Sequence, residues 1–562
     1  MRANFSLDYD VITVEQAQKL YLMARFEAED IQGDRVRRPL NISLVIDRSG
    51  SMAGDKIDFT KQAAQFLVQH LGSQDVLSIV LYNDKVETLF PPEQISNKDR
   101  VSQLLDEIRI RGTTNLSGGW LEGCQHVKSR LADNTLNRVI LMTDGLANRG
   151  VTDASMLVSM TKQKREEGVS TTTMGLGKDF DEDLLMDMAT GGGGAYYFIE
   201  SPEVAPVIFQ EELSGLLRVV GQNLTITVTP TSHVSSVHQL HAYPISTDGK
   251  ASTYRLGDIF GNEVKTLMLE LSIPAMADLG EEQIATLRFE YDEISGETTQ
   301  HHINEMSVMV NVKSEIESPS LPNKEVAQSV LLLKAAQARQ EAVTAADKGH
   351  YEAASGLLRE VANSIDASQI INNELKEERD ALIEQAKKME KGATGYDDYS
   401  RKTMSTQAFF TRTNRHDDTM MLRHREQQRE AANSNRVPQD ANDLARKTLH
   451  KPTKAIHDHK EEILRLPGIV PTHVQWKDKT FLLKGDIIRL GRSSHNEIVL
   501  DERGVSRWHG QIKREGDKLL LEDLGSTNGT TIDGEQIEGI HELSVGDVVY
   551  LCDERLVFLG NN

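Results

Sequence analysis

Between residues 40 and 175 the chain repeats one pattern, in which a short strand-like run is followed by a longer segment with helical spacing. This repetition restricts the possible folds more than any other feature. Largely apolar runs of this length are typical of strands that are covered on both faces. Strands that alternate with helices form parallel sheets. We therefore predict an α/β domain with a doubly wound parallel sheet over residues 39–218. Its strands are LNISLVI at 40–46, VLSIVLY at 76–82, RVILM at 138–142 and STTTMG at 170–175.

The spacing changes to a period of two after about residue 217. The segments NLTITVTP, VKTLMLELSI and IATLRFEYDEI alternate apolar and polar residues. This alternation predicts an antiparallel β-sandwich over 219–316. Residues 19–28 alternate in the same way but have no place in the doubly wound sheet. We therefore expect the strands of 1–38 to join the sandwich, so that the α/β domain is either inserted in the sandwich or followed by it.

Three further parts complete a multidomain chain, as expected for 562 residues. Helical spacing returns over 322–394, where Gly349 marks a break between two helices. Residues 395–466 are polar, mixed in charge and weakly periodic, which predicts a flexible linker. Residues 467–562 contain many short strand patterns separated by turn residues, which predict a C-terminal all-β sandwich.

Charge and cysteine content exclude several classes of protein. The formal net charge of -22 argues against a nucleic-acid binder, because phosphate contacts need an excess of Lys and Arg. The two cysteines, Cys124 and Cys552, cannot form a disulfide framework or a zinc site. The segment MRANFSLDYDVITVEQ lacks the apolar core of a signal peptide, and no run of about 18 apolar residues occurs. We expect no membrane span and a cytoplasmic location.

Oxygen-bearing side chains directly follow two of the predicted strands. Asp47, Ser49 and Ser51 follow the first strand, and Asp144 follows the third. Thr114 lies in the Gly-rich segment GTTNLSGG that leads into a further helix. Ligands of open parallel sheets bind at the carboxyl ends of the strands, so we expect these loops to converge. Carboxylate and hydroxyl oxygens suit Mg²⁺ or another divalent cation, which would readily accept one more oxygen from a partner's Asp or Glu.

The segments IDRSGSM, GTTNLSGG and LMTDG resemble a von Willebrand factor A (VWA) domain over about residues 39–218. GLGKDFDEDLL and GGGGAYYFIE are similar to bacterial intracellular members. In these members a β-sandwich and helices often flank the domain, as in the inter-alpha-trypsin inhibitor heavy chains. The family binds a divalent ion at a metal-ion-dependent adhesion site. The resemblance implies a metal shell in which hydroxyls coordinate directly, the threonine in the open state, and carboxylates act directly or through water. Its members would be Ser49, Ser51, Thr114, Asp47 and Asp144.

The C-terminal segments GRSSHNEIVL, SRWH and GSTNGT resemble a forkhead-associated (FHA) domain. This resemblance implies binding of phosphothreonine on a partner protein. Arginine suits that task because its planar guanidinium donates paired hydrogen bonds to phosphate. Arg492 and Ser506 would hold the phosphate with Arg507 as a further donor, and Thr527 and Asn528 would fix the peptide backbone. The positions with mainly structural roles would be Gly491, His509 and Gly529.

Together these resemblances predict a non-enzymatic signalling adaptor. The FHA domain would read phosphothreonine, the VWA domain would hold a protein through Mg²⁺ and an acidic side chain, and a Ser/Thr kinase and phosphatase would accompany it. A metal-dependent hydrolase is one alternative, although no general base is evident. A structural component of a phosphorylation-regulated assembly is another. Linker threonines are candidate phosphorylation sites for an FHA domain, and they are Thr403, Thr406, Thr411 and Thr413.

Overall fold

The computed structural model contains two compact units, Met1–Pro438 and Gln439–Asn562. No helix in the described part of the chain is both long and apolar enough to cross a membrane. The structure describes the chain except for residues 15, 29–37, 133–134, 200–207, 210–211, 214, 217, 262, 296–297, 315–321, 369, 371, 416–469, 478, 486, 493–495, 501, 503–504, 506–508, 517, 524–525, 527–529, 533–534, 538–539, 552–553 and 561–562.

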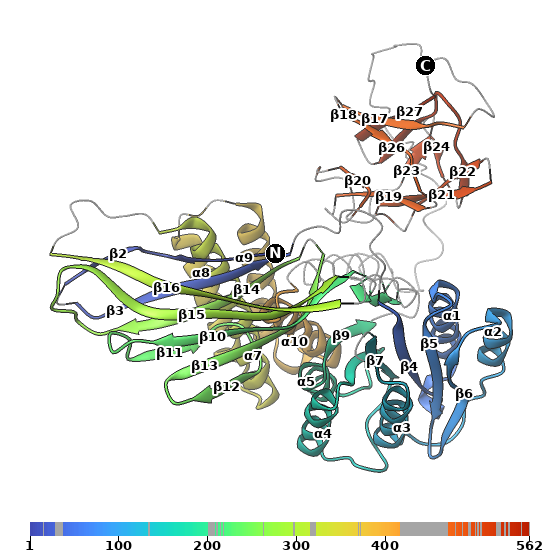
Figure 1. Ribbon diagram of the computed structural model, residues 1–562, viewed down its shortest axis with the longest axis horizontal. Coiled ribbons are helices and arrows are strands. Elements are labelled where there is room, and N and C mark those ends of the chain that lie inside the picture. The colour runs from blue at the N-terminus through green and yellow to red at the C-terminus, as the bar shows by residue number, and fades with distance from the viewer. Residues whose placement is uncertain are drawn as a thin grey trace, which may run out of the picture. The chain divides into compact units, whose positions relative to one another are not determined.

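The α/β domain is built on a six-stranded sheet with the order β6-β5-β4-β7-β8-β9 (Figure 1). Neighbouring strands are parallel except for β5 and β6, which are antiparallel. Every residue of β4 is buried, as expected for a strand that is covered on both faces. The strands are β4 (Leu40–Asp47), β5 (Val76–Tyr82), β6 (Val86–Gln94), β7 (Leu136–Thr143), β8 (Ser170–Leu176) and β9 (Gly193–Ile199).

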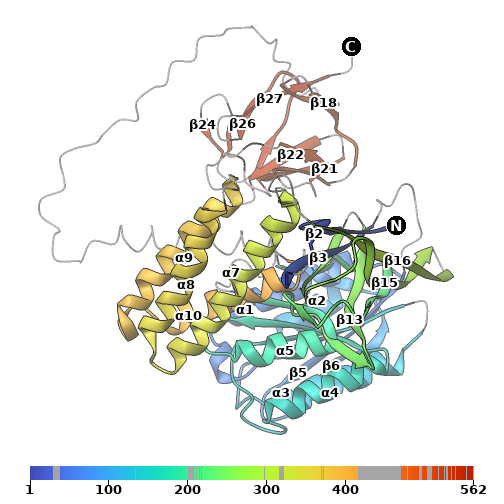
Figure 2. The same ribbon diagram turned by 90° about the vertical axis from the view of Figure 1, so that its left-hand side faces the viewer.

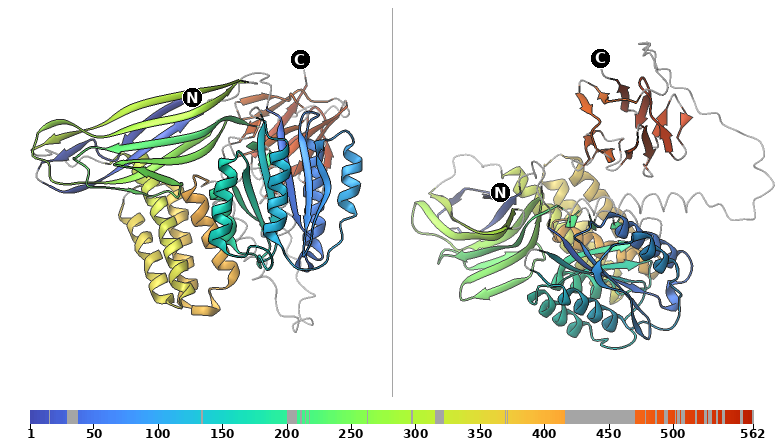
Figure 3. Two further views of the ribbon diagram at one scale, coloured as in Figure 1. Left: turned by 60° about the horizontal axis from the view of Figure 1, so that its bottom comes forward. Right: turned by 45° about the vertical axis from the view of Figure 1, so that its right-hand side comes forward.

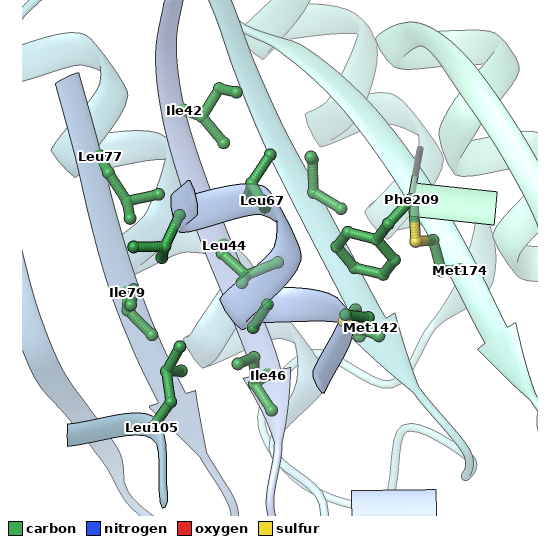
Figure 4. Packing of buried hydrophobic residues seen from close by; sticks show 14 of the residues in the cluster. Ile42, Leu44, Ile46, Leu67, Leu77, Ile79, Leu105, Met142, Met174 and Phe209 are labelled. Carbon is green, nitrogen blue, oxygen red and sulfur yellow. The ribbon is translucent and has the colours of Figure 1, made fainter. Parts of the chain in front are cut away.

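Helices cover both faces of this sheet (Figure 3). On one face Ile42, Leu44 and Ile46 pack with Leu67 of α1 and Leu105 of α2 (Figure 4). The other face packs against α3, α4 and α5. Asparagine or aspartate side chains cap the starts of α2 to α5 by accepting a backbone N–H of the first turn. The helices are α1 (Asp55–His70), α2 (Lys98–Asp106), α3 (Leu116–Ser129), α4 (Ala154–Glu166) and α5 (Glu182–Gly192), and the 3₁₀ turn η1 is Gly50–Met52.

The β-sandwich draws its strands from both sides of the α/β domain in the sequence. Its sheets have the orders β1-β3-β14-β11 and β12-β13-β10-β15-β16-β2. Strand β3 pairs antiparallel with β14, which places Leu22 opposite Leu269, and β2 pairs parallel with β16. The α/β domain is therefore inserted between β3 and β10. The strands are β1 (Arg2–Leu7), β2 (Val11–Thr13), β3 (Gln18–Glu27), β10 (Val219–Pro230), β11 (Ser236–Gln239), β12 (Ile245–Asp248), β13 (Ala251–Phe260), β14 (Val264–Ile273), β15 (Gly280–Ser295) and β16 (Thr298–Lys313).

A helical segment packs beside the sandwich, and Figure 2 shows its helices α7, α8 and α9 lying side by side. Val326, Val330 and Leu333 of α7 share an apolar cluster with Met23 of β3 and Met268 of β14. Gly349 separates α7 from α8 at a φ of 80°, a left-handed conformation that favours glycine. The elements are α7 (Lys324–Asp347), α8 (Tyr351–Ala367), α9 (Asn373–Glu390) and η3 (Gly392–Thr394).

The prediction of a flexible linker over 395–466 is wrong at the start of that segment, because α10 (Asp398–Arg412) forms a docked helix there. Thr403, Thr406 and Gln407 of α10 are fully buried. The helix contacts α7 and α5. Its polar composition concealed this burial, since small hydroxyl groups and paired charges occupy its inner face. The candidate phosphorylation sites Thr403, Thr406 and Thr411 are therefore inaccessible in this arrangement, and the rest of the predicted linker, residues 416–466, lies outside the described residues.

The second unit is an all-β fold with two sheets and one apolar core. The sheets have the orders β18-β17-β27-β26-β23-β24 and β20-β19-β21-β22-β25. The predicted fold class is confirmed, with an α/β domain inserted in a β-sandwich, a helical segment and a C-terminal all-β domain. The strands are β17 (His473–Trp476), β18 (Lys479–Leu482), β19 (Ile487–Gly491), β20 (Ile498–Val499), β21 (Gly510–Glu515), β22 (Lys518–Asp523), β23 (Thr530–Ile532), β24 (Glu535–Gln536), β25 (Ile540–Glu542), β26 (Val548–Leu551) and β27 (Glu554–Leu559).

Candidate functional site

The carboxyl edge of the α/β sheet gathers the side chains that were predicted to bind a metal. Strand β4 ends at Asp47, whose side chain is fully buried. Its Oδ1 accepts the backbone N–H of Ser49 at 2.8 Å, and its Oδ2 accepts the hydroxyl of Thr143 at 2.9 Å. These two hydrogen bonds hold the carboxylate in one orientation at the strand end.

A row of hydroxyl groups connects this strand end to the end of β7. Ser49 Oγ lies 3.0 Å from Ser51 Oγ, and Ser51 donates to Asp144 Oδ1 at 2.7 Å. Asp144 directly follows β7 and is fully buried, whereas Ser51 is exposed. The row therefore runs from the protein interior to the surface, where a partner could reach it.

The loop before α3 completes this edge. The Thr114 carbonyl accepts the backbone N–H groups of Asn148 and Arg149, each at 3.1 Å. A Cβ atom placed on Gly145 would lie 3.6 Å from both Ser51 Oγ and Thr114 Oγ1. The two hydroxyls therefore flank the same glycine, and three loops meet there. The structure thus brings together all the predicted ligands, which are Asp47, Ser49, Ser51, Thr114 and Asp144.

The donor set fits a hard divalent cation, because it consists of carboxylate and hydroxyl oxygens. Burial raises the pKa of Asp47 to about 6 despite its hydrogen bonds from Ser49 and Thr143, and the negative charge of Asp144 adds to the rise. A cation would offset that cost of buried charge. Among the described residues, no group of three or more His, Cys, Asp or Glu side chains is arranged to bind a metal.

Sequence reasoning missed one residue at this edge, Lys56 in the first turn of α1. Its Nζ lies 2.6 Å from Asp144 Oδ2 and 3.8 Å from Asp179 Oδ2. The signal was its position in the first turn of the helix that follows IDRSGSM. Side chains of a helix lean toward its N-terminus, which here begins beside the end of β4. Lys56 is therefore part of the electrostatics of the site.

In the second unit, three of the residues predicted from the FHA resemblance are described, and two of them, Gly491 and Arg492, lie at the end of β19. Gly491 ends this strand, and its carbonyl accepts the N–H of Leu500 at 2.9 Å. Arg492 follows and is half-buried. His509 is fully buried, and its backbone N–H donates to the Leu490 carbonyl at 2.8 Å. The other predicted residues lie outside the described residues, and they are Ser506, Arg507, Thr527, Asn528 and Gly529.

Asp523 supports the GSTNGT segment and was also missed by sequence reasoning. Its carboxylate accepts the N–H and the hydroxyl of Ser526, each at 2.7 Å, and the hydroxyl of Thr530. His509 Nε2 lies 3.9 Å away. Burial raises the pKa of Asp523, but the hydrogen bonds from Thr530 and Ser526 outweigh it and lower the pKa below its usual value. Asp523 thus fixes two residues of this segment to β22.

Family models identify two domains in this chain. The von Willebrand factor type A domain model matches residues 41–211, and the FHA domain model matches residues 488–552. The chain therefore contains a VWA domain and a C-terminal FHA domain, which confirms both resemblances. FHA domains imply phosphothreonine-containing partners, and VWA domains commonly carry a metal site. Both domains support a role in protein interaction or signalling.

Relatives share parts of this architecture at low sequence identity. An uncharacterised protein of Synechocystis sp. is 23% identical over 368 residues, which are 64% of this chain and 85% of that protein. The E3 ubiquitin-protein ligase WAV3 of Arabidopsis thaliana is 24% identical over 305 residues, 53% of this chain and 39% of that protein. The uncharacterised protein YfbK of Escherichia coli is 29% identical over 186 residues, and the match covers 33% of this chain and 32% of YfbK.

A solved structure shares most of the fold of this chain. The von Willebrand factor type A protein from Catenulispora acidiphila has a TM-score of 0.55 at 14% identity. The match covers 72% of this chain and 96% of that one. Because 72% of the chain exceeds the length of the VWA domain, the shared fold includes elements that surround it.

Proposed function

We propose that this protein is a non-enzymatic signalling adaptor with two binding ends. The FHA domain would bind a phosphothreonine-containing partner, and the VWA domain would bind a second protein through Mg²⁺. The observation that carries the proposal is the convergence of oxygen-bearing side chains from three loops at the carboxyl edge of the VWA sheet. The same chain contains an FHA domain, so one molecule could bring the two partners together.

In the proposed metal site, hydroxyls and carboxylates have different roles in coordination. Ser49, Ser51 and Thr114 would contact the ion directly, and Asp47 and Asp144 would act directly or through water. When bound, Mg²⁺ would supply an electrophilic position for a carboxylate oxygen from an Asp or Glu of the partner. The exposure of Ser51 beside two buried carboxylates supports access for such a side chain.

A metal-dependent hydrolase is the competing function, and it would need a group that takes a proton from water. Each of the four carboxylate oxygens of Asp47 and Asp144 already accepts a hydrogen bond. This engagement favours a binding role over proton abstraction, most clearly for Asp47, whose oxygens accept from Ser49 and Thr143. Turnover of a generic phosphoester that depends on added metal would support the hydrolase instead.

We place the adaptor in the cytoplasm, beside a Ser/Thr kinase and its opposing phosphatase. The proposal of this location rests on the small number of cysteines, which is usual for a reducing compartment. The kinase and phosphatase follow from the phosphothreonine chemistry of the FHA domain.

A capture experiment with the full chain tests both ends at once. The immobilised protein is incubated with lysate in Mg²⁺ or in EDTA, and with lysate that was or was not treated with phosphatase. Ser49→Ala should lose only the EDTA-sensitive partner, whereas Arg492→Ala should lose only the phosphatase-sensitive one. Ser129→Ala removes an exposed hydroxyl at the end of α3 and serves as the control. Capture that responds to neither treatment would contradict the proposal.

Calorimetry examines each end without an unknown partner. Titration with MgCl₂ should show binding to the wild type and weaker binding to Ser49→Ala. A phosphothreonine peptide should bind the wild type, its unphosphorylated counterpart should not, and Arg492→Ala should lose the phosphate-dependent affinity. Equal binding by Arg492→Ala and wild type would show that the predicted phosphate contact is wrong.

A further inference from the structure

We propose that Lys56 is a built-in competitor of the metal ion, and this inference rests on the metal site proposed above. In the absence of the ion, its ammonium group balances the charge of Asp144. When the ion binds, the ammonium moves to a second acidic partner, Asp179. Lys56 would thereby lower the affinity of the VWA domain for divalent cations and link metal binding to a side-chain movement.

The contact between Lys56 and Asp144 supports the first position. Lys56 Nζ lies 2.6 Å from Asp144 Oδ2, while Ser51 donates to Asp144 Oδ1 at 2.7 Å. Asp144 is fully buried, whereas the Lys56 side chain is 23% exposed. Among the described residues, the ammonium group therefore satisfies a carboxylate that would otherwise be buried with one hydroxyl as its hydrogen-bond donor. A divalent ion bound to the same carboxylate would be repelled by this ammonium.

The surroundings of Lys56 support the second position. Asp179 Oδ2 lies 3.8 Å from Lys56 Nζ, and the Asp179 side chain is 59% exposed. A Cβ atom on Gly177 would lie 3.2 Å from Lys56 Cε and 3.5 Å from Nζ, so the glycine leaves room for the lysine chain. Gly177 also has a φ of +74°, which disfavours other residues there. Lys56 thus has an acidic partner nearer the solvent within a short movement.

Lys56→Met tests the competition directly, because it keeps the length of the side chain and removes the charge. Removal of a unit positive charge a few ångströms from the ion should strengthen Mg²⁺ binding by about tenfold or more. The measurement is calorimetric titration of the full chain with MgCl₂. Lys56→Arg should retain affinity close to that of the wild type. Lys61→Met makes the same charge change on α1, where Lys61 contacts the Asp106 carbonyl, and should change the affinity little.

Asp179→Asn tests the second position through a double-mutant cycle. In the wild-type background it should weaken Mg²⁺ binding, because Lys56 loses its alternative partner. In the Lys56→Met background its effect should be much smaller. Equal effects of Asp179→Asn in the two backgrounds would overturn the role of Asp179 as the alternative partner.

Thermal unfolding separates competition from a merely structural role of Lys56. In EDTA, Lys56→Met should unfold at a lower temperature than the wild type, and added MgCl₂ should shrink or reverse this difference. A difference that stays constant, or Mg²⁺ binding by Lys56→Met that is unchanged or weaker, would overturn the inference while leaving the metal site intact. Failure of the wild type to bind Mg²⁺ would overturn the proposed site as well.

Discussion

A buried ion pair joins α10 to the VWA domain and can be removed with one substitution. Lys402 of α10 bonds to Glu182 of α5 and to the carbonyl of Phe180, and both charged side chains are about 5% exposed or less. Lys402 Nζ also lies 4.3 Å from the centre of the Phe180 ring. Lys402→Met keeps most of the side-chain volume but removes the charge and the hydrogen bonds.

The expected loss follows from the burial of Glu182. Removal of one partner from a buried pair leaves an uncompensated charge and costs about 3–5 kcal/mol. Arg401 also bonds to Glu182 and would remain, so we expect the lower limit of about 3 kcal/mol. That free energy corresponds to an increase of about 100-fold in the equilibrium constant for opening of α10.

Hydrogen–deuterium exchange of the full chain measures this opening locally. In Lys402→Met, amides of α10 should exchange about 100-fold faster, whereas amides of α2, on the other face of the sheet, should change little. Lys387→Met is the control, because Lys387 forms an exposed pair with Glu384 and contributes little to stability. Equal exchange of α10 in the two variants would refute the reasoning and assign the docking to apolar contacts.

Three further predictions concern the stability of the first unit. Gly119→Ala should lower the free energy of unfolding by about 2 kcal/mol, since the new Cβ would lie 2.6 Å from the Tyr82 ring. Gly356→Ala lies in a helix, and its new Cβ would have no neighbouring atom within 4 Å, so it should instead raise the free energy of unfolding by about 0.5–1 kcal/mol. Urea unfolding measures both changes, and a change of the opposite sign in either variant would contradict the prediction. Burial, aided by the charge of Arg412, lowers the pKa of His241 from 6.5 to about 3. The unfolded chain therefore binds the extra proton below about pH 6.5, and stability should fall toward pH 5 by about 2 kcal/mol, with a weaker fall in His241→Gln.

The order of the domains and the meeting of Asp47, Ser51 and Asp144 at the carboxyl edge of the VWA sheet could be predicted because both follow from local sequence. The run before Asp47 is apolar throughout, and the ends of parallel strands share one edge whatever the details of packing. The polar side chains of this edge lie in short segments such as IDRSGSM and LMTDG, each directly after a strand. Knowing which strands are neighbours in the sheet is therefore enough to predict that these side chains meet.

Other features depend on side-chain contacts between distant segments and had no local pattern. The burial of α10 relies on hydroxyl groups and paired charges such as Lys402, which composition assigns to the surface. The contact of Lys56 with Asp144 joins residues 88 positions apart. Likewise, the period of residues 19–28 predicts a strand but not its pairing with β14.

The insertion of the VWA domain between β3 and β10 also determines which parts of the chain can fold first during translation. Strand β3 leaves the ribosome long before its partner β14, and its edge stays unpaired in that interval. The VWA domain has its own apolar clusters and can fold meanwhile, as N-terminal parts of long chains do during translation. Arg38, just before the insert, lies with its Nη1 3.4 Å from Oε1 of Gln222 in β10. The two ends of the insert are therefore close in the folded protein, which shortens the loop that the sandwich must close. We expect stalled nascent chains that end before residue 264 to resist proteolysis in the VWA domain while β3 is still cleaved.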